Sequence, residues 1–183
     1  MIPLFKSHYS IGKSILTLNS LDKCKEGGSD SIFEIAQENK LKEIYLVEDS
    51  LIGFLQANKI SNDLGIQLIF GLRLSVTHKI SSNKQENKLC THKVIVFAKN
   101  DEGCKLLNKI YSKAFSDHDG VILSKDLKSL WSEDNLLLAI PFYDSFIFMN
   151  TLHFCTCVPD FSFTSPMFFI EDNLLPFDFI IKE

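Results

Sequence analysis

One stretch decides the fold class of this chain: His92–Ala114, with the sequence HKVIVFAKNDEGCKLLNKIYSKA. Its first part, His92–Phe97, is apolar and rich in β-branched residues, which is typical of a buried strand. A polar AKNDEG turn follows, and the spacing of the next apolar residues predicts an amphipathic helix over Gly103–Phe115. A buried strand that passes through a short turn into a helix is a building unit of α/β proteins, so we expect an α/β fold.

On both sides of this stretch, apolar runs of strand type alternate with segments of helical period. The sequence predicts further strands at Pro3–Phe5, Glu43–Val47, Ile66–Phe70, Leu72–Val76 and Leu136–Ile140. It predicts further helices after a cap at Asp30 or Ser31, over Leu51–Leu64 and over Leu123–Trp131. Strands separated by helices favour mostly parallel pairing with right-handed crossovers, in an open sheet or a barrel.

The sequence also predicts how two of these segments end or connect. The helix over Leu51–Leu64 precedes Gly65, which suits the left-handed conformation that closes helices. The polar run Thr77–Thr91 has neither period nor apolar content, so we expect an exposed loop or hairpin tip there. We expect the helix over Leu51–Leu64 to direct these side chains inward: Phe54, Leu55, Ala57, Ile60 and Leu64.

The C-terminal part is less regular. Pro141–Phe169 is dense in aromatic residues and is interrupted by Pro159 and Pro166. The sequence stops at IIKE, directly after the apolar segment LLPFDF, and an α/β domain that ended there would leave this segment without obvious cover. We therefore expect an incomplete fold or the front part of a longer chain. No linker divides residues 1–183, so we expect a single domain.

Composition narrows the classes of function. The chain has 183 residues, of which 45% are hydrophobic and 16 are Phe, and this content supports a well-filled core. The formal net charge of -4 gives no general attraction for phosphate, so we expect at most indirect contact with DNA. No run approaches the roughly 20 apolar residues of a membrane span. Because Met1–Ser20 also lacks a secretory signal pattern, we expect a cytoplasmic protein without membrane contact.

Four motifs occur in register between Leu4 and Ile140. AKNDEGCKLLNKIYSKA holds a strand end, an AKN-x-x-G turn and a helix, and GFLQANKISNDLGIQLIFG holds a helix, an aliphatic-Gly-aliphatic step and a strand leading to Gly. KSHYS follows the first strand at Lys6–Ser10, and LVED ends another strand at Leu46–Asp49. In order and spacing these motifs resemble the polymerase and histidinol phosphatase (PHP) domain at the N-terminus of the bacterial DNA polymerase III alpha subunit. The resemblance implies a PHP-like distorted (β/α) barrel.

The resemblance also implies where a metal site would lie, because PHP domains gather His and carboxylate ligands for divalent metals at strand ends. The family's His-x-His motif aligns with Leu4 and Lys6, its Asp-His pair with Glu48 and Asp49, and its Gly-x-Glu carboxylate with Arg73. Neither an alkyl chain nor a cation binds a metal, so we predict no metal, no other cofactor and no catalytic residue. Glu48 and Asp49 alone would hold Mg or Mn weakly. We expect Lys6 to form an ion pair with one of these two carboxylates.

Two other groups of potential ligands favour structural roles. His8 is two residues from Lys6 and resembles a shifted ligand, but its place before the aromatic-Ser pair predicts an exposed position. His153, Cys155 and Cys157 are of the types that bind zinc, but their alternation favours one face of a half-buried strand.

Two functions from different classes follow. The first is a non-catalytic PHP-like domain, a structural platform in DNA replication. The resemblance implies that it packs against a polymerase body or other replisome subunits and offers a docking surface to a proofreading exonuclease. The second is a metal-dependent phosphoesterase or 3'-5' exonuclease with rearranged ligands around Glu48, Asp49 and His8, which would require Mg or Mn. The first function accounts better for the residues at the aligned positions.

Overall fold

The structure, a computed structural model, describes residues 2–10, 15–19, 23–24, 28–78, 91–153, 158–171 and 178. The helices in this part of the chain are α1 (Ile32–Glu38), α2 (Phe54–Leu64), α4 (Asp101–His118), α5 (Ser124–Ser129) and α6 (Phe146–His153). The strands are β1 (Leu4–Phe5), β2 (Glu43–Glu48), β3 (Gln67–Thr77), β4 (Thr91–Ala98), β5 (Val121–Leu123), β6 (Leu136–Pro141) and β7 (Met167–Phe169). The expected α/β class is confirmed.

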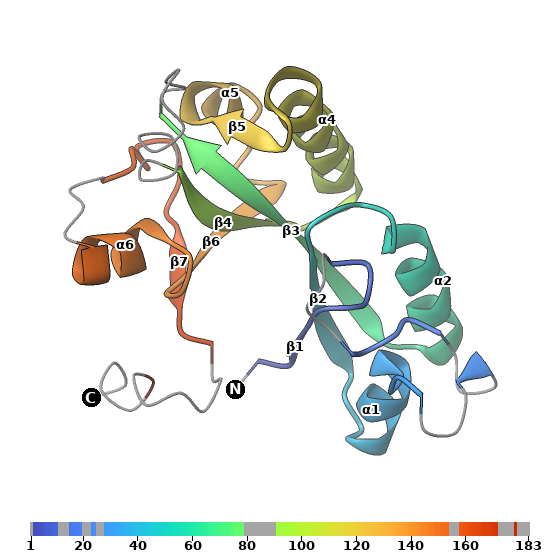
Figure 1. Ribbon diagram of the computed structural model, residues 1–183. Coiled ribbons are helices and arrows are strands. Elements are labelled where there is room, and N and C mark those ends of the chain that lie inside the picture. Colours follow the sequence, from blue (N-terminus) through green and yellow to red (C-terminus); the bar gives the residue numbers. More distant parts are fainter. Residues whose placement is uncertain are drawn as a thin grey trace.

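These strands form one curled, mixed sheet that resembles half of a barrel (Figure 1). The strand order is β1-β2-β3-β4-β6-β7, and β5 pairs with the end of β3. Pairing is parallel between β1 and β2, β2 and β3, β3 and β5, and β6 and β7. It is antiparallel between β3 and β4 and between β4 and β6. The centre of the sheet is therefore antiparallel, whereas parallel pairing lies toward the two edges.

The antiparallel centre has a local cause in the long strand β3. The sequence predicted two strands, Ile66–Phe70 and Leu72–Val76, but β3 runs through Gly71 without a break. Its last residue, Thr77, pairs with Thr91, the first residue of β4. Consecutive strands that pair directly in this way form a hairpin and are antiparallel, because a parallel return requires a long crossover. The β3–β4 pairing makes these two strands a hairpin, and the exposed loop or hairpin tip expected between them, residues 79–90, lies outside the described residues.

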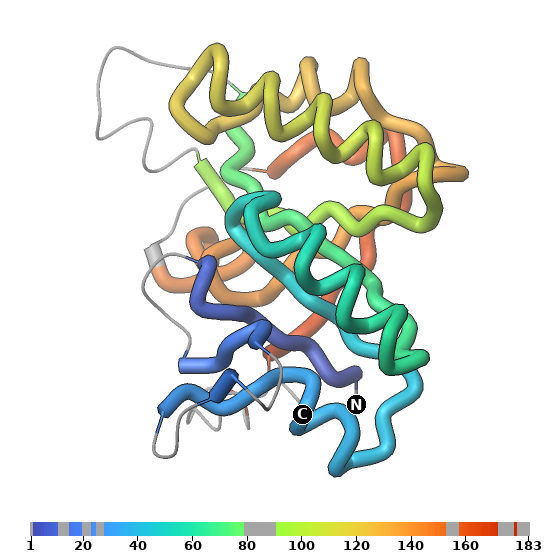
Figure 2. The backbone as a smooth tube through the Cα atoms, turned by 90° about the vertical axis from the view of Figure 1, so that its right-hand side faces the viewer, coloured from blue at the N-terminus to red at the C-terminus, as the bar shows by residue number. Residues whose placement is uncertain are grey.

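The helices α1, α2 and α4 cover one face of the sheet, as Figure 2 shows, and α6 lies on the other side in Figure 1. Alternate residues of β3 face these helices and are at most 4% exposed. They belong to the main apolar cluster, together with residues of α1, α2, α4 and α5. The members from β3 are Phe70, Leu72, Leu74 and Val76. Burial of this face supplies most of the hydrophobic stabilisation that holds the helices to the sheet.

The predicted strand–turn–helix unit is present, and α4 begins two residues earlier than predicted. Asn100 caps the helix, because its side-chain oxygen accepts a hydrogen bond of 2.9 Å from the Gly103 backbone N–H. A Cβ atom at Gly103 would lie 2.2 Å from the backbone oxygen of Asn135. The AKNDEG turn therefore needs glycine at this position, since α4 packs closely against the chain that leads into β6.

The helix α2 ends as predicted but faces a different direction. Gly65 closes it with φ of 67°, in the left-handed region. The buried positions are Ala57 and Ser61, whereas Leu55 is 77% exposed and Leu64 is 37% exposed. The expected inward direction of Leu55 is wrong because it lies one residue, about 100° of helix rotation, from the buried stripe.

The C-terminal part contains two elements that the sequence did not predict, α6 and β7. β7 extends the sheet beside β6, with Ile140 opposite Phe168. His153 is the last residue of α6, so the expected strand at this position is wrong, and Cys155 and Cys157 lie outside the described residues.

Candidate functional site

Three strand ends meet at one edge of the sheet. β1, β2 and β3 run parallel, and Glu48 at the end of β2 pairs with Leu72 of β3. Lys6 follows β1, Asp49 follows β2, and Arg73 is the next residue of β3 after this pair. The register therefore brings side chains from distant parts of the sequence into one cluster, which we call the strand-end cluster: Lys6, Ser7, Ser10, Glu48, Asp49 and Arg73.

Side-chain alternation along β2 divides this cluster between the two faces of the sheet. Leu46 belongs to the main apolar cluster under the helices, and Val47 belongs to a smaller apolar cluster on the opposite face. Glu48 therefore lies on the same face as Leu46, and Asp49 lies on the same face as Val47. The two carboxylates are adjacent in sequence but have separate surroundings.

Asp49 forms a two-point ion pair with Arg73. The Nε of Arg73 donates to Oδ1 at 2.6 Å, and its Nη2 donates to Oδ2 at 2.9 Å. The two side chains are only 14% and 16% exposed. Burial alone would raise the pKa of Asp49, but the hydrogen bonds and charge of Arg73, helped by the charges of Lys6 and Lys93, hold this pKa below its ordinary value. Asp49 is therefore a charged carboxylate whose two oxygens are both occupied.

Glu48 is fully buried and is held by two donors from the segment after β1. The backbone N–H of Ser7 donates to Oε1 at 2.8 Å, and the hydroxyl of Ser10 donates to Oε2. The Ser10 oxygen in turn accepts a hydrogen bond of 3.2 Å from the Asp49 backbone N–H. Both serines are buried. The KSHYS turn is thus anchored to the end of β2 through a buried carboxylate.

Lys6 does not form the expected ion pair. Within the described residues its amine has no hydrogen bond and no carboxylate oxygen within 4.0 Å, whereas Arg73 binds Asp49 instead. Burial and the charge of the Arg73 guanidinium lower the pKa of Lys6, and the charges of Asp49, Glu171 and Glu48 offset part of this effect. The guanidinium is favoured for Asp49 because its planar fork matches both carboxylate oxygens at once.

The last aligned position, Leu4, lies outside the cluster. It is 37% exposed and pairs with Tyr45, further back along β2. His8 is exposed, as expected, and its ring lies 4.1 Å from the ring of Tyr9.

Four polar residues near the strand-end cluster were not identified from the sequence. Lys93 of β4 is opposite Ser75 of β3, and its amine donates to the Ser75 hydroxyl at 2.7 Å. The Tyr143 hydroxyl donates to Asp178 at 2.6 Å, and this hydrogen bond raises the pKa of Tyr143 to about 12. The first pair follows from the β3–β4 register, which the sequence did not predict. The second joins the turn after β6 to the C-terminal segment, and no local pattern indicates such a contact.

The donor set does not suit a divalent metal. The described residues contain no group of three or more His, Cys, Asp or Glu side chains that could hold one. The carboxylates of Glu48 and Asp49 already accept hydrogen bonds on all four oxygens. A cation would have to displace Arg73 from Asp49 and serine donors from a fully buried Glu48, which makes this cluster a poor ligand set for Mg or Mn.

The fold and the cluster define an α/β protein with a curled mixed sheet and a charge-paired cluster at its strand ends. A scan of the chain against models of protein families gives no match, and a search of curated proteins gives none either. Within the described residues, every helix is too short or too polar to cross a lipid bilayer.

Proposed function

We propose that this chain is a non-catalytic PHP-like domain of a DNA polymerase III alpha-type protein and acts as a structural platform in DNA replication. One observation carries the non-catalytic part: the Arg73–Asp49 ion pair occupies the strand-end position where a metal-dependent enzyme of this type needs free ligands. A guanidinium compensates the negative charge there permanently, without an ion from solution. The motif order between Leu4 and Ile140 supports the family assignment.

The proposed partners are a polymerase body or other replisome subunits, including a proofreading exonuclease. The chain reaches DNA only through such an assembly, because its net charge of -4 gives no general affinity for the phosphate backbone. Its contribution is to hold these partners in place in the cytoplasm, and it requires no cofactor.

Two assays on the purified chain test this function. The chain should not hydrolyse 3'-labelled single-stranded DNA or p-nitrophenyl phosphate in Mn²⁺ or Mg²⁺. It should form a complex with the polymerase body of an alpha subunit from the same cell, measured by sedimentation velocity. Metal-dependent hydrolysis that Asp49→Ala abolishes would overturn the proposal in favour of a phosphoesterase or exonuclease, and failure to form the complex would refute the platform role.

Replacement of the aligned residues tests the PHP resemblance itself. The combined substitutions Leu4→His, Lys6→His, Asp49→His and Arg73→Glu introduce the family's ligand types at four aligned positions, with Glu48 retained. We expect this variant to bind Mn²⁺ in equilibrium dialysis. The matched control contains Arg73→Gln in place of Arg73→Glu and should bind more weakly, because it lacks one carboxylate ligand. A folded variant that binds no more Mn²⁺ than its control would show that these positions do not form a PHP site.

A further inference from the structure

A groove lies between α1 and α2 on the outer side of the helix layer, where Figure 2 shows the two helices as neighbours. Its volume is about 830 Å³, which is within the range of binding sites in other proteins. Phe33 of α1 and Leu55, Ile60 and Leu64 of α2 form its apolar part. The groove is therefore large enough to take apolar side chains from outside the chain.

A protruding apolar side chain stands at the edge of this groove. Leu55, in the first turn of α2, is 77% exposed, and Ile52, just before the helix, is 70% exposed. Leu64, at the other end of α2, is 37% exposed. Apolar side chains that are exposed together mark interaction sites in many proteins. The same patch of surface thus contains both an apolar protrusion and a hollow that can receive one.

Charges of both signs line the groove. Among the described residues, none of these four side chains forms an ion pair: Lys23, Lys59, Glu34 and Asp63. On α4, Lys113 and Asp117 are four residues apart and are paired at 2.7 Å. Lys59 and Asp63 have the same order and spacing on α2, but no such pair joins them in the described part of the chain. Their charges are therefore available to groups outside the chain.

We propose that this groove is the interface of a symmetric dimer, in which α2 of one copy packs antiparallel against α2 of a second copy. Leu55, Lys59 and Asp63 follow one another at intervals of four residues and lie on one stripe of the helix. A two-fold axis near the middle of α2 brings Lys59 of each copy opposite Asp63 of the other. It also brings Leu55 of each copy to the Leu64 end of the other groove.

A second copy suits this surface because a two-fold interface must be complementary to itself. Each protrusion has to meet a hollow, and each charge has to meet its opposite, within one and the same patch. The groove provides the Leu55 protrusion beside a hollow, and it contains two cations and two acids. This inference goes beyond the platform function and does not depend on the PHP resemblance, since it concerns only the outer surface of α1 and α2.

Sedimentation velocity of the purified chain alone tests the dimer, and no polymerase body is present to confuse it with the platform function. The sedimentation coefficient should rise with protein concentration from that of a monomer to that of a dimer. Leu55→Asp should abolish this rise, because it places a charge in the apolar part of the interface. Val158→Asp, at a position that is 74% exposed and outside both helices, is the matched control and should dimerise like the parent. A parent chain that stays monomeric, or a Leu55→Asp variant that dimerises normally, would overturn the proposal.

Charge reversal tests the pairing across the two-fold axis. Lys59→Glu and Asp63→Lys should each dimerise at least about tenfold more weakly than the parent, because like charges then face each other twice. A mixture of the two variants should restore the affinity, since opposite charges meet again at both contacts of the mixed dimer. Lys113→Glu, on α4, is the control and should dimerise like the parent. A mixture as weak as the single variants, or a dimer that neither reversal weakens, would overturn the proposed interface.

Discussion

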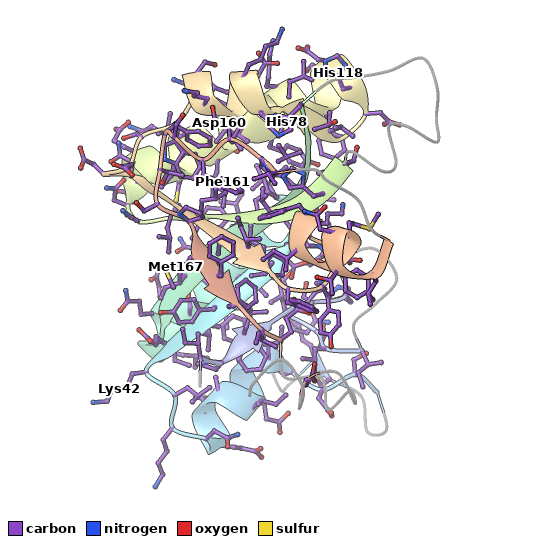
Figure 3. The ribbon with its side chains drawn as sticks, turned by 90° about the vertical axis from the view of Figure 1, so that its left-hand side faces the viewer. Lys42, His78, His118, Asp160, Phe161 and Met167 are labelled. Carbon is purple, nitrogen blue, oxygen red and sulfur yellow. The ribbon has the colours of Figure 1, made fainter. Side chains whose placement is uncertain are left out.

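The two faces of strand β3 are covered in different ways, one by apolar packing and the other by polar contacts. Toward the helices, Leu72 and Leu74 are at most 2% exposed and lie in a continuous apolar layer. On the opposite face, Ile69 packs on a small apolar cluster, and Arg73 and Ser75 then take up polar contacts with Asp49 and Lys93. Figure 3 looks onto this side, where β7 carries Met167. Apolar side chains pack on one face, whereas charged and polar side chains contact each other across strands on the other.

This difference between the two faces of β3 predicts where a substitution mainly changes stability and where it mainly changes local chemistry. The apolar face binds the helices, and its sequence is constrained by packing volume. The charged face contains the Arg73–Asp49 pair of the strand-end cluster, where the chemistry of individual residues matters more than their volume. Substitutions on the two faces should therefore have effects of different size and different pH dependence.

The largest effect should come from the apolar face. Leu72→Ala removes a fully buried side chain and should lower the free energy of unfolding by about 3 kcal/mol, because it loses hydrophobic burial and leaves a cavity. Ile69→Ala, on the same strand but partly buried on the other face, is the matched control and should cost less. Urea denaturation measures both. Equal losses would mean that the two faces do not differ in packing.

Gly103→Ala tests the close contact between α4 and the segment before β6. The added methyl group would overlap the backbone oxygen of Asn135. We therefore expect overpacking to lower the free energy of unfolding by about 1–3 kcal/mol, although alanine has a better helix propensity than glycine. Cys104→Ala, at the next position of the same helix, controls for helix propensity and should be milder. A stabilised Gly103→Ala variant would show that this contact is looser than described.

Asp49→Asn tests the charged face. It leaves the Arg73 guanidinium without its carboxylate. Because the pair is slightly exposed, we expect the free energy of unfolding to fall by about 1–3 kcal/mol at neutral pH. The folded-state pKa of Asp49 is lowered, so its contribution is complete above the ordinary carboxyl pKa of about 3.9 and is lost as the pH falls through the folded-state pKa. The difference between the parent and the variant should therefore shrink in acid. If the parent chain and Asp49→Asn differ by the same free energy of unfolding from pH 7 to pH 3, the pKa of Asp49 is not shifted in the folded state.

The smallest effect should come from the exposed surface of α4. Lys105 and Glu102 form an ion pair at 2.5 Å, but their side chains are 67% and 64% exposed. Such pairs gain little because water screens them, so Lys105→Gln should leave the urea midpoint unchanged within error. A clear loss would mean that solvent-exposed pairs matter in this protein as much as the strand-end pair.

The sequence predicted those features that depend on neighbouring residues. The strand–turn–helix of His92–Ala114, a helix cap at Asp30 or Ser31 and the Gly65 helix end all follow from local spacing and backbone preference. All three are present, with Ser31 as the cap. Features that depend on register between distant strands were not predicted. The register of the antiparallel β3–β4 pair is one, because the sequence left open whether a loop or a hairpin joins these strands, and this register places Lys93 beside Ser75.

The strand-end cluster shows the same limit. The positions aligned with the PHP metal site placed Lys6, Glu48, Asp49 and Arg73 together at the strand ends, but the cation expected there was wrong. We expected Lys6 to pair with Glu48 or Asp49, and Arg73 binds Asp49 instead. The choice depends on side-chain phase and geometry, because Arg73 lies beside Asp49 on the neighbouring strand and offers a two-point contact. The serine donors to Glu48 depend on how the KSHYS turn folds back, which no periodicity predicts.

We infer that charges within the protein, rather than a metal, compensate the carboxylates at the strand ends. Equilibrium dialysis of the chain against Mn²⁺, with metal measured by atomic emission, tests it most directly. We predict no stoichiometric binding, and no difference between the parent chain and Asp49→Ala. Retention of one or more equivalents of Mn²⁺ by the parent chain, lost in Asp49→Ala, would mean that a metal compensates these carboxylates and would overturn this inference.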